Sequence, residues 1–198
     1  MPRLIVPPLD TSVGFVSRAG VKLHAALTAL QLNIRGFIAA DLGSHVGGFV
    51  DCLLVHGAAR VYAVDTAYGV LAWKLRRDPR VIVMERRNAL HLALPEKVDL
   101  LTIDVGWTRQ EKILPVAAGL VRPGGSILTL VKPHYESEAA VRQRGVLTEA
   151  QALDELAKVA ENIRKMDLAI SSMVKSPITG HGGNNEFILL LRTGAAGR

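Results

Sequence analysis

The stretch AADLGSHVGGFVD, residues 39–51, decides the fold class of this chain. It overlaps a short apolar run, FIAADL (37–42), and then passes through a loop that contains Gly43, Gly47 and Gly48 before a second apolar segment begins. Glycines between a strand and a helix allow the backbone to pass close to a ligand at the carboxyl edge of a parallel sheet. The stretch therefore predicts an α/β fold that holds a nucleotide-like ligand at this loop.

Short apolar runs alternate with helical patterns along the rest of the chain. We expect strands at 37–42, 61–65, 81–85, 98–104 and 126–132, and helices at about 17–32, 47–56, 71–77, 111–121 and 148–166. We also expect Pro123 and the turn Gly124–Gly125 to close the fourth of these helices. Alternation of this kind indicates βαβ units and a parallel sheet.

The tail of the chain departs from this alternation. Two further strands are expected, at 168–175 and 186–192, and no helix separates them. Strands joined in this way must run antiparallel to each other. One antiparallel terminal strand in a parallel sheet is typical of the class I fold of S-adenosylmethionine-dependent methyltransferases. We therefore expect a Rossmann-like α/β domain with a mostly parallel seven-stranded sheet and an antiparallel C-terminal strand.

Length and composition fit one domain. The chain has 198 residues, a formal charge of +6, 49% hydrophobic residues and 5% aromatic residues. We expect an N-terminal arm over 1–16, which contains three prolines, and a single domain over 17–198. The positive charge suits a polyanionic partner, but many basic proteins bind no nucleic acid, so charge alone does not choose between these alternatives.

The sequence also carries expectations about location. Cys52 is the only cysteine and cannot form an internal disulfide, and its apolar surroundings predict a small buried helix residue. The N-terminus lacks a signal-peptide pattern, and no apolar run reaches the roughly 18 residues needed to cross a membrane. We expect a cytoplasmic protein without a membrane partner.

Two acids flank the glycine loop and suggest which ligand it holds. Asp65 closes the strand VYAVD, where a carboxylate can accept hydrogen bonds from both ribose hydroxyls of an adenosine. Asp41 lies at the end of the strand that precedes the glycine loop. A carboxylate there attracts the cationic S-adenosylmethionine but would repel the pyrophosphate of a dinucleotide. The alternative is that both acids cap neighbouring helices. Asn88, after the next strand, is equally suited to the adenine edge and to a turn.

Four charged residues are expected to meet over the same cleft: Lys22, Asp104, Lys132 and Glu186. Two lysines and two carboxylates at strand ends and on the first helix suggest proton abstraction from a hydroxyl. Lys132 is the expected base, with a pKa lowered by burial and by the charge of Lys22. Taken singly, Lys22 and Glu186 would be interpreted as solvated charges; as a set of four they favour catalysis without a metal ion.

The strings SRAGVKL, DLGSHVGGFVD, VYAVD, AWKLRRDPRV, TIDV, LVKPHYE and SPITGHGGNNEF occur in this order. Together they resemble the FtsJ-like RNA 2′-O-methyltransferases, most closely the haemolysin-named (TlyA-type) ribosomal RNA methyltransferases, over residues 16–192. The resemblance implies S-adenosylmethionine as methyl donor, ribosomal RNA as substrate and a catalytic tetrad at Lys22, Asp104, Lys132 and Glu186. It places the methyl-donor site at Asp41, Gly43, Ser44, Gly47, Gly48, Phe49, Asp65, Asn88 and Asp104.

The chain departs from this pattern in several places. His45 and Val46 replace the small hydroxyl residues usual in the loop, and DVGWTRQ differs after Asp104. Members of this branch usually carry an N-terminal S4 RNA-binding domain, whereas about 16 residues precede SRAGVKL here. We therefore expect RNA to be bound by basic residues of the domain or with a partner protein in place of the S4 domain.

The sequence offers several residues for RNA contacts. The basic candidates are Arg18, Lys74, Arg76, Arg77, Arg86, Arg87, Arg109, Lys112 and the Arg142–Arg144 loop, each of which is individually more typical of a solvated surface. Residues 137–145 are expected to form a flap over the substrate. Trp107 or Tyr135 is expected either to stack on a base or to pack in the core.

Two functions remain in competition on the sequence alone. The first is a methyltransferase that acts on the ribose 2′-hydroxyl of RNA. The second is an RNA-binding or assembly factor that keeps the cofactor pocket with little or no catalysis. A pore-forming haemolysin, which the name of the branch suggests, is disfavoured because the sequence has no membrane-spanning segment.

Overall fold

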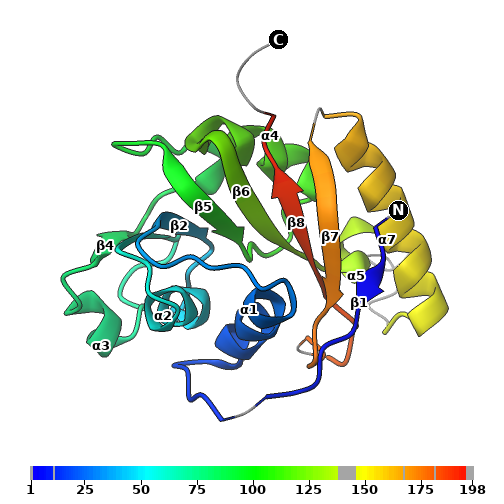
Figure 1. The fold of residues 1–198 in the computed structure, drawn as a ribbon, viewed down its shortest axis with the longest axis horizontal. Coiled ribbons are helices and arrows are strands. Elements are labelled where there is room, and N and C mark those ends of the chain that lie inside the picture. The colour runs from blue at the N-terminus through cyan, green and yellow to red at the C-terminus, as the bar shows by residue number, and fades with distance from the viewer. Residues whose placement is uncertain (1, 11, 138–145, 167, 181, 195–198) are drawn as a thin grey trace.

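An eight-stranded sheet runs through the part of the chain that the computed structural model describes, residues 2–10, 12–137, 146–166, 168–180 and 182–194 (Figure 1). The strand order is β1-β7-β8-β6-β5-β2-β3-β4. The strands are β1 (Leu4–Ile5), β2 (Ile38–Leu42), β3 (Arg60–Val64), β4 (Val81–Met84), β5 (Val98–Ile103), β6 (Val121–Val131), β7 (Ala169–Lys175) and β8 (Phe187–Arg192).

Strand β8 is antiparallel to both of its neighbours. It lies between β6 and β7, with Leu190 opposite Leu128 on one side and Leu189 opposite Met173 on the other. The other neighbouring pairs are parallel. This arrangement confirms the predicted class I methyltransferase fold. The sheet has eight strands where seven were expected, because Leu4 and Ile5 pair with the outer edge of β7 (Figure 1).

Helices cover both faces of the sheet. They are α1 (Arg18–Ala29), α2 (Gly48–Val55), α3 (Trp73–Arg76), the 3₁₀ helix η1 (Ala89–His91), α4 (Gln110–Leu120), α5 (Pro133–Glu136) and α7 (Glu149–Arg164). Apolar side chains of α1, α2 and α3 pack in one core cluster, and those of α4 and α7 pack in a second. The two clusters explain why the sheet strands are nearly continuously apolar.

The start of β6 differs from the prediction. Pro123 and Gly124–Gly125 were expected to form a turn after the helix, but α4 ends at Leu120 and β6 includes these residues. The register with β5 shifts between Val98 and Leu100, which are opposite Val121 and Ser126. The extra residues form an irregularity within the strand, and Gly124 adopts a φ of +75° that favours glycine there.

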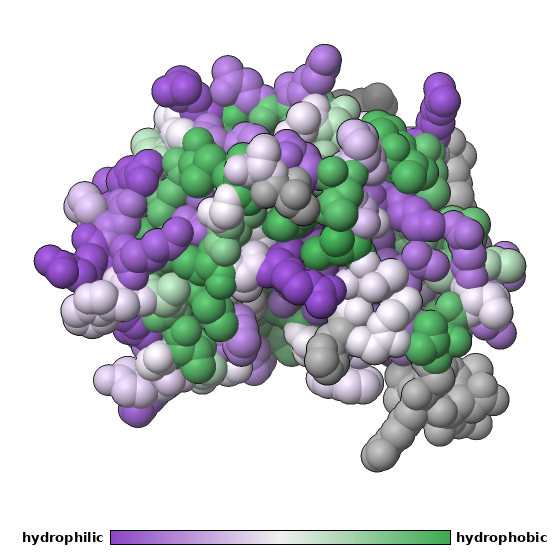
Figure 2. Space-filling model, turned by 90° about the horizontal axis from the view of Figure 1, so that it is seen from below, coloured by the Kyte–Doolittle hydropathy of each residue, from purple (hydrophilic) through white to green (hydrophobic). Residues whose placement is uncertain are grey.

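The parallel strands end at one edge of the sheet, and the loops that follow them gather there. Strands β2, β3, β5 and β6 are followed at this edge by the glycine loop, by Asp65, by Asp104 and by Lys132. Figure 2 views the molecule from below, toward this edge, and shows hydrophilic side chains near the centre of the face with hydrophobic patches on both sides. In this fold such an edge is where ligands bind.

Candidate functional site

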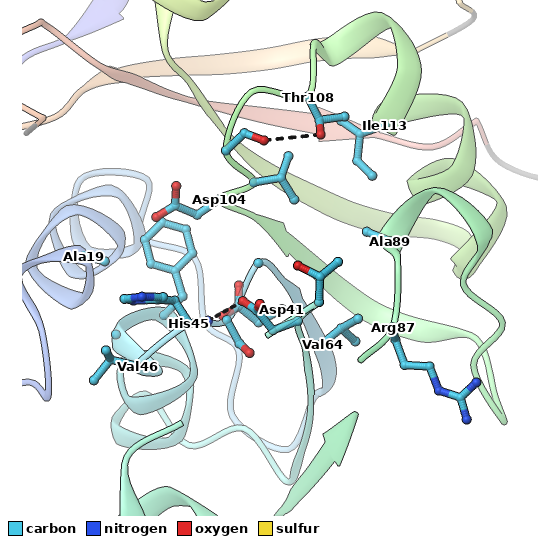
Figure 3. Close-up of a pocket in the computed structure, with 18 of the residues that line it drawn as sticks. Ala19, Asp41, His45, Val46, Val64, Arg87, Ala89, Asp104, Thr108 and Ile113 are labelled. Carbon is cyan, nitrogen blue, oxygen red and sulfur yellow. Dashed lines mark hydrogen bonds between the residues drawn. The ribbon is translucent and has the colours of Figure 1, made fainter. Parts of the chain in front are cut away.

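A cavity of about 390 Å³ lies at this edge, between the loops that follow β2, β3, β4 and β5 (Figure 3). Of the residues predicted to bind the cofactor, Asp41, Gly43, Ser44, Gly48, Phe49, Asp65, Asn88 and Asp104 line it. Gly47 is outside this lining. It precedes α2 with a φ of +102°, and a side chain there would collide with Leu71 and Leu75, so Gly47 shapes the loop from behind.

Gly43 brings the glycine loop against the end of β5. Its φ is +87°, and a Cβ atom at this position would lie 2.5 Å from the carbonyl oxygen of Asp104. The backbone N–H of Asp104 donates to the carbonyl of Leu42 at 2.9 Å. Only glycine allows this close approach, which places the first wall of the cavity beside Asp104.

Asp65 holds the loop in place. Its Oδ2 accepts a hydrogen bond from the backbone N–H of His45 at 2.7 Å, and its Oδ1 accepts one from Ala67 at 2.8 Å. His45 itself has a φ of +46°, and it lines the cavity, as does Val46. Asp65 therefore has a structural role as well as a position in the cavity wall.

Asp41 is buried at the base of the cavity. Its Oδ1 accepts a hydrogen bond from the hydroxyl of Thr102 at 2.7 Å, and only 1% of the residue is exposed. Its Oδ2 has no hydrogen-bond partner among the residues that the structure describes. Burial raises the pKa of Asp41 to about 8, against the effect of the Thr102 hydroxyl. A cationic ligand group would satisfy this oxygen and favour the ionised carboxylate.

The four predicted catalytic residues form two ion pairs. Nζ of Lys132 lies 2.6 Å from Oδ1 of Asp104, and Nζ of Lys22 contacts Oε2 of Glu186. Lys22 and Glu186 are buried, and Lys132 and Asp104 line the cavity. The charge of Glu186 also acts on Lys132, so the two pairs lie close to each other. The structure thus brings the four residues together, although they come from α1, from the residues directly after β5 and β6, and from the residue before β8.

The pKa of Lys132 differs from the prediction. Burial favours the neutral amine, but the negative charges of Asp104 and Glu186 outweigh it and raise the pKa of Lys132 above its ordinary value. The predicted lowering by the charge of Lys22 is therefore wrong for this arrangement. The reason is geometric, because Lys22 pairs with Glu186 while Lys132 has a carboxylate of its own.

The loop before β8 fixes Glu186. Gly180 lies against the Glu186 carboxylate so closely that a side chain there would overlap it. The backbone N–H of Ser176 donates to the Glu186 carbonyl at 2.9 Å, and Arg18 of α1 donates to the carbonyl of Thr179 at 2.8 Å. This loop therefore docks on the helix that carries Lys22.

An aromatic pair stands beside Lys132. The rings of Trp107 and Tyr135 stack with centroids 4.3 Å apart and planes 23° apart. Nζ of Lys132 lies 5.5 Å from the centroid of the Tyr135 ring. Trp107 is 71% exposed, so packing in the core, which was one of the two expectations, is wrong for this residue. Its φ of +57° shows that the loop after Asp104 holds it in an uncommon backbone conformation.

Asn88 has the turn role that was one of its two interpretations. Its Oδ1 accepts a hydrogen bond from the N–H of Leu90 at 2.9 Å and caps η1, while the residue also lines the cavity. Its contact with adenine stays a prediction. Several other lining residues were not predicted to belong to the cofactor cavity, although Arg87 was a candidate for RNA contacts: Thr66, Arg87, Leu90, Val105 and Thr108. All of them follow the ends of β3, β4 or β5 closely, which is the signal that could have found them. Figure 3 shows the Arg87 side chain extending away from the other labelled residues.

Several basic candidates for RNA contacts are engaged within the protein. Arg76 pairs with Glu85, Lys74 lies 2.9 Å from Asp51, and Arg86 lies over the Tyr68 ring at 4.2 Å. Lys112 is exposed on α4. The Arg142–Arg144 loop, and the predicted flap beyond Ser137, lie outside the described residues. Among the described helices, none is both long and apolar enough to cross a bilayer.

The chain is similar to known methyltransferases. The family model of the FtsJ-like methyltransferases matches residues 15–193. The 16S/23S rRNA (cytidine-2′-O)-methyltransferase TlyA of Mycobacterium tuberculosis is 38% identical over 190 residues, which cover 93% of this chain and 70% of TlyA. YqxC of Bacillus subtilis, whose name describes an rRNA methyltransferase, is 39% identical over 184 residues, which cover 89% of this chain and 65% of YqxC.

A solved structure of a hemolysin-named protein from Streptococcus thermophilus has a TM-score of 0.86 and 32% sequence identity, and the match covers 93% of this chain and 69% of that protein. The chain spans about two thirds of the length of these relatives. The family model nonetheless matches residues 15–193, which is nearly the whole chain. This chain belongs to the FtsJ-like methyltransferase family.

Proposed function

We propose that this chain is an S-adenosylmethionine-dependent methyltransferase that acts on the ribose 2′-hydroxyl of RNA, and of ribosomal RNA in particular. The observation that carries the proposal is the Lys132–Asp104 ion pair at a cavity whose base holds the unsatisfied carboxylate oxygen of Asp41. The family supports it, as does the printed name of TlyA, which describes methylation of a cytidine 2′-oxygen in rRNA.

The cavity residues suit S-adenosylmethionine. Asp41 Oδ2 would accept the ammonium group of its amino-acid part, because this oxygen is buried without a partner among the described residues. Asp65 would accept the ribose hydroxyls, and the amide nitrogen of Asn88 would meet the adenine. The remaining wall is formed by Gly43, Ser44, Gly48 and Phe49, with Gly47 behind the loop. When bound, the cofactor supplies a methyl group on a sulfonium, from which the carbon–sulfur bond breaks as the new carbon–oxygen bond forms.

Lys132 would act as the base in this reaction. A neutral amine at Nζ would accept the proton of the 2′-hydroxyl as the oxygen attacks, so the ammonium must first lose a proton. Asp104 also lines the cofactor cavity. A cationic ligand group there would be attracted to the Asp104 carboxylate and would compete with Lys132 for it. Burial, which already favours the neutral amine, would then weigh more heavily. Lys22 and Glu186 would position this pair from the α1 side.

The Trp107–Tyr135 pair supports a nucleic-acid substrate. A large indole that is 71% exposed and stacked on a second ring presents a flat apolar face to solvent beside the proposed base. Unstacked bases of RNA commonly pack on such aromatic faces. The net charge of +6 favours the same class of partner.

One observation favours the second candidate function, an RNA-binding or assembly factor with little or no catalysis. The raised pKa of Lys132 keeps its amine protonated at neutral pH in the structure described here. A protein that used the tetrad only as a charged surface would need no deprotonation. The same residues would then contact RNA phosphates, and S-adenosylmethionine would stabilise the fold.

Methyl transfer separates the two candidates. We would incubate wild-type protein and Lys132→Ala with labelled S-adenosylmethionine and either naked ribosomal RNA or assembled subunits, digest the RNA to nucleosides and identify the labelled species. Label in a 2′-O-methyl nucleoside that disappears in Lys132→Ala supports the enzyme. Cofactor and RNA binding by both proteins without label on either substrate supports the binding factor, and label on a base rather than a ribose contradicts the proposal.

A further inference from the structure

Three potential metal ligands meet where α1 packs on α2, away from the tetrad. His24 lies on α1, Cys52 lies on α2 and His56 caps the C-terminus of α2. One ligand atom from each of them lies within 4.8 Å of the other two. Nδ1 of His24 and Nε2 of His56 are 2.9 Å apart. Cys52 is fully buried, whereas His24 and His56 remain partly exposed.

We propose that His24, Cys52 and His56 bind one Zn²⁺ ion. Thiolate and imidazole are both common zinc ligands, and open zinc sites use three protein ligands with a water in the fourth position. Cys52 lies on α2 and His56, four residues later, is the C-cap residue of the same helix, a spacing that places the two side chains on one side of it. This site is separate from the cofactor cavity, so the inference does not depend on the proposed methyltransferase activity.

Asp10 completes the arrangement around His24. Its Oδ2 lies 3.4 Å from Nε2 of His24, on the opposite side of the ring from Nδ1. A carboxylate in this position favours the tautomer with the proton on Nε2, so that Nδ1 presents its lone pair to the cluster. Carboxylate–histidine–zinc arrangements of this kind orient the ring and make it a stronger ligand. Asp10 therefore acts as a positioning residue from the N-terminal arm.

The cluster requires only small movements to bind the ion. Two nitrogens at about 2.0–2.1 Å from one tetrahedral zinc are roughly 3.3 Å apart, against 2.9 Å between His24 and His56 here. The rings must therefore separate slightly, and Sγ of Cys52 must approach them. The side chain of His24 is 13% exposed, so the cluster reaches the protein surface at this ring. Binding would release one proton, from the Cys52 thiol, while the proton on Nε2 of His56 moves to Nδ1 of the same ring.

The contact between His24 and His56 also has an interpretation without a metal ion. The competing interpretation is a pair of hydrogen-bonded histidines over an inert thiol, which would have no affinity for metal. A bound ion would instead tie α1, which carries Lys22, to α2, which begins at the glycine loop.

The test uses untagged, chelator-treated full-length protein titrated with Co²⁺ alone, because tetrahedral Co²⁺ reports its ligands by absorption. We expect one equivalent to bind, with a thiolate-to-cobalt charge-transfer band in the near ultraviolet, and Zn²⁺ to displace it. Cys52→Ala should lose the charge-transfer band, and His56→Gln should bind at least tenfold more weakly. Asp10→Asn should weaken binding by about 10- to 100-fold. His91→Gln is the matched control, since His91 is an exposed histidine on η1 outside the cluster.

The proposal is overturned if wild-type protein shows no saturable Co²⁺ binding, or if the spectrum of Cys52→Ala matches that of the wild type. Circular dichroism checks that each variant is folded. If Cys52→Ala does not fold, His56→Gln decides the matter, because its side chain is only partly buried. Unchanged affinity in a folded His56→Gln would likewise refute the three-ligand site, and an unchanged Asp10→Asn would refute the role of Asp10.

Discussion

Nζ of Lys132 lies 2.6 Å from Oδ1 of Asp104, and the two residues directly follow the neighbouring parallel strands β6 and β5. Parallel strands that are adjacent in a sheet end side by side, so their next residues meet without any long loop. Both residues line the cofactor cavity, and the charge of Glu186 also acts on Lys132. Its geometry links cofactor binding to the protonation of the proposed base.

Lys132→Ala should abolish methyl transfer while leaving the cofactor bound. A positioned general base contributes about 10²- to 10⁴-fold to a rate, so we expect a loss of that order in label transfer to RNA. Calorimetric titration with S-adenosylmethionine should show an affinity within a few fold of the wild type. Lys165→Ala is the matched control, since Lys165 is exposed at the end of α7. Equal loss in both lysine variants would contradict the assignment.

The rate should rise with pH because the pKa of Lys132 is raised. Below a raised pKa the amine is protonated, and the neutral fraction grows about tenfold for each unit of pH. The value of kcat/KM for S-adenosylmethionine, which reports ionisations in the cofactor-free protein, should therefore keep rising from about pH 6.5 to pH 9.5. A plateau that begins below pH 8 would show that the pKa of the base is low and that the pairing with Asp104 does not govern it.

Asp41→Asn should lower the affinity for the cofactor and raise the stability of the folded protein at high pH. The pKa of Asp41 is raised to about 8 in the folded protein, so the folded state holds a proton that the unfolded state loses near pH 4. Wild-type stability should therefore fall as the pH rises from about 4 to 8, and this loss is complete above pH 8. The amide cannot ionise, so the variant should gain on the order of a few kcal/mol relative to wild type at pH 9.

Denaturant unfolding of both proteins at pH 5 and pH 9 measures this gain, and calorimetry measures the cofactor. We expect S-adenosylmethionine to bind the wild type more tightly as the pH approaches 8, and to bind Asp41→Asn at least tenfold more weakly. The same stability difference between the two proteins at both pH values would rule out the ionisation of Asp41 as the cause.

Trp107→Ala should weaken the binding of the RNA substrate and leave the affinity for the cofactor unchanged. Stacking of one base on an aromatic ring is worth about 1–3 kcal/mol, so kcat/KM for RNA should fall by roughly 5- to 150-fold. Trp107→Phe should restore most of the rate. The matched control is Trp73→Ala, because Trp73 on α3 is 72% exposed against 71% for Trp107. An equal effect of both substitutions would point to general loss of RNA affinity instead of stacking at the site.

Gly43→Ala should lower both the stability of the fold and the affinity for the cofactor. The residue has a φ of +87°, and the added Cβ would press on the Asp104 carbonyl at 2.5 Å. We expect a loss of about 1–3 kcal/mol in the free energy of unfolding together with weaker cofactor binding. Gly119→Ala is the control, because a Cβ there meets nothing within 4 Å. Calorimetry and denaturant unfolding of the two variants check the prediction, which fails if Gly43→Ala is as stable as Gly119→Ala.

Sequence patterns predicted most of the fold because they depend on local preferences. The alternation of apolar runs and helical segments gave the order of the elements, and the helix-free connection before 186–192 gave the antiparallel strand. The two-residue strand β1 carried no such signal, since it is a strand only through its pairing with β7. The irregular start of β6 was missed for the same reason, because its register depends on β5.

The candidate site divides in the same way. Residue types and their positions at strand ends were enough to nominate Asp41, Asp65, Asp104 and Lys132, and all four line the cavity. The direction of the Lys132 pKa shift was beyond sequence, because it depends on whether a carboxylate or a lysine lies within a few ångströms. The exposure of Trp107 was also undetermined until the loop after Asp104 was placed.

The amino-acid sequence by itself determined the class I fold, the glycine loop and the identity of the four charged residues, because periodicity, turn chemistry and motif order are properties of neighbouring residues. Only the tertiary structure decided which charges pair, and that His24 on α1 lies close to Cys52 on α2 and to His56 at the end of α2. Electrostatic and coordination energies change steeply over a few ångströms, and such distances are set by packing between segments that lie far apart in the chain.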